Sequence, residues 1–111
     1  MAYDEELAHR IRELLAGEHG LSEMSMFGGL AFLLDGNMSV AASGHGGLMV
    51  RVDPDSSDRV LSLAHASAMQ MRGRTMKGWI RVDGEGVRTK RQLNSWVQRG
   101  VQFARTLPPK G

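Results

Sequence analysis

The sequence lacks cysteine and is poor in aromatic residues, which make up 5% of its 111 positions. Without cysteine the chain has no disulfide and no thiolate metal site. No apolar run approaches the roughly 20 residues of a membrane-spanning helix. The chain starts with acidic Asp4, Glu5 and Glu6 where a signal peptide would be basic and then apolar. These absences predict a cytoplasmic protein without a membrane segment.

A chain of this length has room for one hydrophobic core. We therefore expect a single domain over residues 1–111. Pro108 and Pro109 would stop the last helix, because proline lacks the N–H that a helix needs. The residues from about 108 to 111 are expected to form a flexible tail.

Charge is distributed unevenly along the sequence. Residues 1–50 contain two basic and seven acidic side chains, whereas residues 51–111 contain twelve basic and five acidic ones. Such an asymmetry is typical of a surface for nucleic acid or for an acidic partner. It is equally compatible with two solvated faces of a small domain.

The longest apolar run, within Met26–Asn37, is followed by Asp35-Gly36 and then by a second, alternating run. This pattern predicts a β-hairpin. Its register has two readings. A two-residue turn pairs Leu34 with Asn37 and Phe32 with Ser39, whereas a three-residue loop pairs Leu34 with Met38 and Phe32 with Val40. Turn statistics favour the first and the hydrophobic pattern favours the second.

Three segments have the signals of helices. Apolar residues recur at helical spacing from Asp4 to about Glu18. Asp53 and Pro54 are suited to the N-cap and first position of a second helix that ends near Ala66. Thr89 and Gln92 form a capping box before a third helix that reaches about Leu107.

Strand patterns fill the intervals between these helices. We expect three or four strands before the second helix, in a meander that ends with Leu48–Val52, and two strands after it, up to Val82. The fold class is therefore α+β, in the order α-β(3-4)-α-β(2)-α. One antiparallel sheet is expected to be flanked by three helices.

The residue types that commonly serve in catalysis or metal binding show no recognisable arrangement in this sequence. His9, His19, His45 and His65 lie in different elements and lack the spacing of metal ligands. The glycines around His45 lead into a strand, so they predict a turn in preference to a phosphate-binding loop. No serine lies in a nucleophile elbow. We expect no catalytic residue, no metal and no cofactor, and thus a protein that is not an enzyme.

A group of basic residues surrounds the strand that contains Trp79. Basic side chains around an aromatic ring suit nucleic acid, which makes nucleic-acid binding the alternative function. The competing interpretation places Trp79 in the core and the charges on a solvated face, and we favour it. The basic residues are Arg72, Arg74, Lys77, Arg88, Lys90 and Arg91.

Met26-Phe27-Gly28-Gly29, the Asp35-Gly36 turn and Gly78-Trp79 resemble the N-terminal domain of the TfoX/Sxy family of competence regulators. The chain lacks the family's helical C-terminal domain, so we expect a stand-alone member. The resemblance implies a secretion-chaperone-like fold and a non-enzymatic role in protein interaction or regulation. No catalytic residue comes with the motif. We interpret its residues as structural, and Gly28 and Gly29 as positions where positive φ or close packing excludes a β-carbon.

The chain has eight methionines. They are interpreted first as irregular core filling. Those on strands, however, supply more soft apolar surface than three helices cover, and no strand is protected by proline or a row of lysines. We therefore expect a protein partner and a homodimer with strand residues in its interface. The strand methionines are Met24, Met26, Met38, Met49 and Met76.

Overall fold

The described part of the chain contains three α-helices and six β-strands, in the order expected from the sequence. The structure is a computed structural model that describes residues 3–26, 28–44, 46–71 and 73–109. The helices are α1 (Glu5–Leu15), α2 (Ser57–Leu61) and α3 (Lys90–Arg105); short 3-10 turns, η1 (Pro54–Ser56) and η2 (Gly84–Val87), precede α2 and α3. The strands are β1 (Leu21–Met26), β2 (Gly29–Leu34), β3 (Asn37–Ala42), β4 (Leu48–Arg51), β5 (Ala66–Met71) and β6 (Arg74–Val82).

All six strands form one antiparallel sheet in the order β1-β2-β3-β4-β6-β5. The first four form a meander. The chain then passes through α2 to the opposite edge, and β6 fills the place between β4 and β5. The expected α+β class with one antiparallel sheet is confirmed, with four strands before α2 and two after it.

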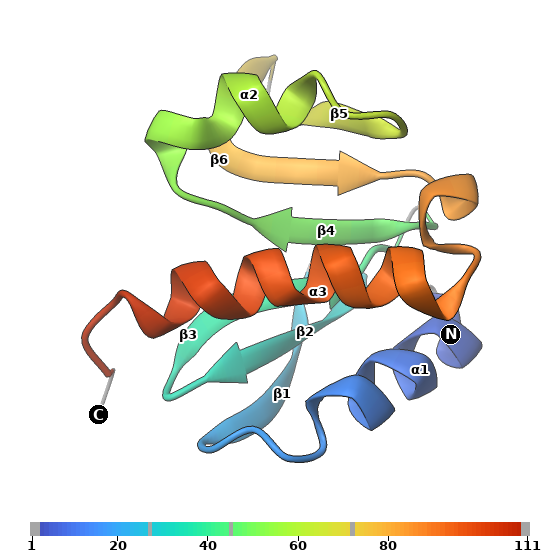
Figure 1. Ribbon diagram of the computed structural model, residues 1–111, viewed down its shortest axis with the longest axis vertical. Helices are drawn as coiled ribbons and strands as arrows, with labels where there is room; N and C mark the ends of the chain where they lie inside the picture. The colour runs from blue at the N-terminus through green and yellow to red at the C-terminus, as the bar shows by residue number, and fades with distance from the viewer. Residues whose placement is uncertain (1–2, 27, 45, 72, 110–111) are drawn as a thin grey trace.

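The main core lies between one face of this sheet and the helices. Figure 1 shows α3 passing in front of β3 and just below β4, with α1 below it and α2 near β5 and β6. Alternate strand residues point into this layer, as the two-residue period of a strand requires. The largest fully buried side chains there are Ile11, Leu15, Phe32, Leu34, Val40, Leu48, Val50, Ile80, Val82, Leu93 and Val97.

Capping side chains set the helix starts. The Asp4 carboxylate accepts hydrogen bonds from the amides of Glu6 and Leu7 at 3.0 and 3.1 Å. At the start of α3, Thr89 and Gln92 make the reciprocal bonds of the predicted capping box. Because these bonds satisfy amides that have no partner within the helix, they fix where each helix begins.

The register of β2 and β3 combines the two readings of the sequence. Leu34 pairs with Asn37, as a two-residue turn requires, and both turn residues, Asp35 and Gly36, have positive φ of 51° and 83°. Yet Phe32 pairs with Val40, because Ser39 is an extra, bulged residue. The Ser39 hydroxyl donates to the Phe32 carbonyl at 2.9 Å, so the bulge is internally bonded. A β-bulge therefore satisfies both the turn chemistry and the hydrophobic pattern.

The bulge is also where α3 lies nearest to the sheet. A β-carbon at Gly100 would overlap the Ser39 carbonyl oxygen and press on Val40. The backbone of α3 thus contacts the backbone of β3 with no side chain between them. Gly100 is accordingly a packing requirement, although glycine weakens a helix interior.

The described residues of the Met-Phe-Gly-Gly motif lie where β1 ends and β2 begins. Met26 pairs with Gly29, and Gly28 has a φ of 77°. A β-carbon at Gly29 would overlap the Ala42 carbonyl oxygen on β3. The structure thus supports the structural interpretation of both glycines, while Phe27 lies outside the described residues.

The edge strand β1 is tied to α1 by an ion pair. Arg12 donates two hydrogen bonds to the Glu23 carboxylate, at 2.6 and 2.9 Å. This bond lowers the pKa of the Glu23 carboxyl below its ordinary value. The pair is largely exposed, so its contribution to stability is small.

One predicted boundary was wrong. The second helix ends at Leu61 instead of near Ala66, because Ala66 already begins β5 and pairs with Val82. The flexible tail from about residue 108 stays a prediction. The Asn37 side-chain amide donates to the Pro108 carbonyl at 2.9 Å and ties that residue to β3. Residues 110–111 lie outside the described residues.

We predict that Gly100→Ala lowers the free energy of unfolding by roughly 1 to 3 kcal/mol, because the added methyl group forces α3 away from the bulge. Gly17→Ala is the matched control, since a β-carbon there meets nothing within 4 Å. Urea titrations followed by circular dichroism measure both. Equal midpoints for the two variants would contradict the close approach of α3 and β3.

Candidate functional site

The sheet face opposite the helices carries a groove of about 450 Å³, which we call the methionine groove. Its lining comes from β1 to β6 and thus from both halves of the sequence. Six of the eight methionines of the chain line it. The lining residues are Met24, Met26, Leu33, Gly36, Met38, Met49, Arg51, Met69, Met76 and Trp79.

The floor and the walls of the groove differ in burial. Leu33, Met38 and Met49 are buried and belong to a second apolar cluster, separate from the main core. Met24 in the wall of the groove, by contrast, exposes 49% of its surface. Trp79 is only partly buried and packs on the second cluster. Interpreting the methionines as core filling is therefore wrong for the walls, and Trp79 does not lie in the main core.

Arg51 is the one charged residue among the described residues that line the groove. Its guanidinium carbon lies 5.6 Å from the centre of the Trp79 ring and 5.4 Å from that of the Phe103 ring of α3. At such distances a guanidinium is attracted to the aromatic faces, which hold the side chain in place. A guanidinium stacked on rings keeps its N–H groups free to donate in the plane.

The motif residues that carry the family resemblance divide into two sets. Met26, Gly36 and Trp79 line the groove. Gly78 has a φ of 84° and donates its amide to the Ser57 hydroxyl at 3.3 Å. Asp35 binds Arg105. The motif therefore supplies part of the groove as well as the turns that shape it.

The basic residues of the nucleic-acid hypothesis do not form one patch. They fall into a group at the start of β6 and a group after its end, so the length of the strand separates them (Figure 1). Arg88 is moreover paired with Glu85 at 3.3 Å. The first group is Arg74 and Lys77, the second is Arg88, Lys90 and Arg91, and Arg72 lies outside the described residues.

Within the described residues, no group of three or more histidines and carboxylates is placed to hold a metal ion. His65 has a positive φ of 70°, and its Nδ1 lies 3.0 Å from an Asp83 carboxylate oxygen. His65 and Ser95 both line one shallow depression, but in the described part of the chain Ser95 makes no hydrogen bond to His65. His45 lies outside the described residues.

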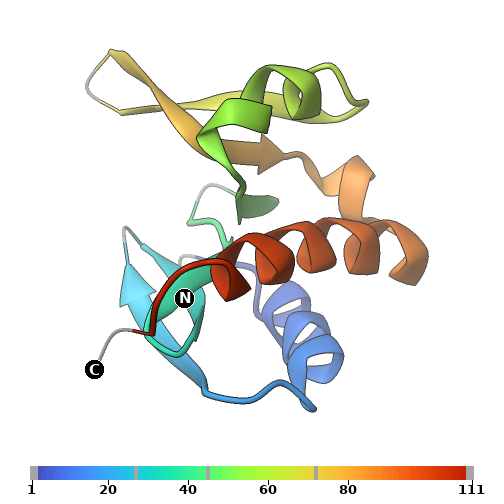
Figure 2. The same ribbon diagram turned by 60° about the vertical axis from the view of Figure 1, so that its left-hand side comes forward.

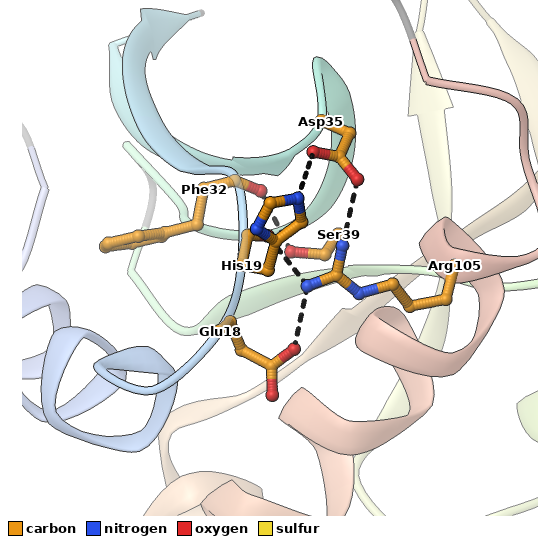
Figure 3. Close-up of polar contacts among 6 residues, drawn as sticks. All are labelled: Glu18, His19, Phe32, Asp35, Ser39 and Arg105. Carbon is orange, nitrogen blue, oxygen red and sulfur yellow. Dashed lines mark hydrogen bonds and ion pairs between the residues drawn. The ribbon is translucent and has the colours of Figure 1, made fainter.

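The densest polar cluster surrounds Arg105 at the end of α3 (Figure 3). Its guanidinium donates to Glu18 at 3.0 Å, to the His19 carbonyl at 2.7 Å and to Asp35 at 3.1 Å. One side chain thus joins α3 to the α1–β1 connection and to the β2–β3 turn. All of these bonds join connecting segments of the fold. We therefore interpret the Arg105 cluster as structural and call it the clamp, because it holds the Asp35-Gly36 end of the groove in place.

Arg105→Gln is expected to lower the free energy of unfolding by about 1 to 2 kcal/mol, since charge-assisted bonds at a half-buried site are lost. Arg91→Gln removes the same charge from an exposed position and serves as control. Thermal unfolding in low and high salt measures both. A loss no greater than that of the control would show that the clamp contributes nothing.

Comparison with known proteins places the chain in a family. No helix in the described ranges is long and apolar enough to cross a membrane. No curated protein gives a significant match to the chain. The family model of the TfoX N-terminal domain matches residues 13–104, which include every described strand, α2, nearly all of α3 and the end of α1. The chain therefore belongs to the TfoX N-terminal domain family.

Proposed function

We propose that this protein is a non-enzymatic interaction module that binds a protein partner in the methionine groove. The observation that supports this proposal is the lining of the groove. Thioethers, an aromatic ring and one guanidinium are groups that bind apolar and anionic surfaces. Unbranched methionine side chains adapt to different shapes, which suits a surface that takes up another chain.

The proposed cellular role is regulatory, as in the TfoX/Sxy regulators of competence that the sequence resembles. The position of the groove supports such a role, because a partner bound there leaves the main core undisturbed. The nucleic-acid alternative gains no support, since its basic residues lie at both ends of β6 and do not converge.

Selection of displayed peptides on the intact protein tests this proposal. We predict that selected peptides bind Met24→Lys at least about tenfold more weakly, because the exposed Met24 side chain becomes a charge that must be desolvated. Leu63→Lys is the matched control, since Leu63 is the other large exposed apolar residue and lies outside the groove. If both variants bind the peptides equally well, the groove is not the binding site.

Homodimerisation is a separate proposal and concerns the sheet edges. The edges are β1 and β5. Glu23 places a charge on β1, whereas β5 contains neither a charge nor a proline. An unprotected edge of this kind supports pairing of β5 with β5 of a second copy.

Light scattering after size exclusion, at micromolar protein concentration, is expected to give about twice the monomer mass of 12.2 kDa. Gln70→Pro should return the mass to that of the monomer, because a proline removes an N–H from the edge. A monomer mass for the unmodified protein would contradict this dimer and leave the groove proposal unaffected.

A further inference from the structure

The methionine groove offers side chains to a partner, but little backbone. β2 and β4 are paired on both sides over most of their length, whereas β3 and β6 pair with β4 only over Val40–Ala42 and Trp79–Val82. The main chain of the groove floor at Leu33 and Met49 therefore has sheet partners on both sides. A segment lying across this floor cannot satisfy its own N–H and C=O groups by adding a strand there, and burying them without partners is costly. An α-helix meets this requirement, because its backbone groups bond within the segment.

The groove also has an electrostatic preference. Where the structure describes the lining, it contains one arginine and no carboxylate. Arg81 pairs with Met49 across β4 and β6, so its side chain lies on the same sheet face and next to the groove. Within the described ranges neither Arg51 nor Arg81 forms an ion pair. Two cations beside an apolar groove favour an occupant with acidic side chains at its margin.

A second copy of this chain does not fit these requirements. The apolar faces of α1 and α3 are already buried in the main core, so a second copy has no such face to offer. Two grooves placed face to face would also lack charge complementarity, because each described lining offers a cation and no carboxylate. The occupant is therefore another protein.

Resting on the proposed function, we propose that the methionine groove binds an amphipathic α-helix of a partner protein. The helix presents a stripe of large apolar side chains at positions i, i+3, i+4 and i+7, with glutamate or aspartate beside the stripe. The apolar side chains lie on Met38, Met49 and Leu33. The acidic side chains bind the guanidinium groups of Arg51 and Arg81, and the methionines of the walls adapt to the shape of the stripe.

Fluorescence polarisation with labelled 18-residue peptides tests this proposal on the whole protein. The first peptide has a leucine and phenylalanine stripe flanked by glutamates. The second replaces these glutamates by lysines, and the third has the composition of the first in an order that breaks the stripe. We expect micromolar affinity for the first peptide and at least about tenfold weaker binding of the other two.

Protein variants then locate the acidic contact. Arg51→Met keeps an apolar side chain against the rings but removes the charge, and it should abolish most of the preference for glutamate over lysine. Arg91→Gln removes an exposed charge on α3 and should leave that preference intact. Circular dichroism of each variant verifies that it is folded.

Three results would overturn the proposal. Equal binding of the glutamate and lysine peptides would remove the acidic partner. Equal binding of the scrambled peptide would remove the helix and favour an extended or small apolar ligand. An unchanged preference in Arg51→Met would place the acidic contact elsewhere. If selected peptides are sensitive to Met24→Lys while the designed helices fail, the proposed function stands and this inference alone is wrong.

Discussion

The contact between Gly100 of α3 and the bulged Ser39 of β3 is the constraint on which the rest of the structure depends. The bulge adds one residue, Ser39, to β3 shortly after the Asp35-Gly36 turn. It thereby places Val40 towards the helices and Met38 on the opposite face. Because the carbonyl of Ser39 projects towards α3, only a glycine lets the helix lie that close. One irregularity thus sets both the packing of the helices and the floor of the groove.

The two sheet faces have different chemistry as a consequence. The face towards the helices carries mainly leucine, valine, isoleucine and phenylalanine, whose shapes specify a well-packed core. The opposite face carries methionines, a tryptophan and an arginine. Adaptable side chains are a poor choice for specifying a core but a good one for contacting a surface that varies. This difference is the physical basis for assigning the partner to the helix-free face.

Local signals in the sequence were sufficient for most of the fold. The Thr89–Gln92 capping box, the Asp35-Gly36 turn and the strand that begins at Leu48 each have a short-range cause, and each prediction was confirmed. The register of β2 and β3 was left open because two local rules disagreed. The bulge that reconciles them depends on α3, which lies some sixty residues further along the chain.

The groove was harder to predict than the fold. Methionines at alternating strand positions were recognised as soft apolar surface, but which face each strand turns to the helices depends on the sheet order. The insertion of β6 between β4 and β5 brings Trp79 beside Arg51. The pairing of β5 with β6 shifts register between Ile80 and Thr75, which gives a bulge around Gly78, where φ is 84° and where Met76 and Trp79 both reach the groove. Neither the long-range pairing nor the bulge has a signal in the local pattern of residues.

We propose that a partner protein binds the sheet face opposite the helices. The most direct measurement is a methyl NMR titration of the intact protein, labelled at methionine and leucine methyl groups, with the tightest peptide from selection. The account predicts that the methyl signals of Met24, Met38 and Met49 shift with one common affinity, while that of Leu63 on the α2–β5 connection stays in place. Shifts concentrated at Leu63 and on the helices, with the groove methionines unmoved, would contradict it.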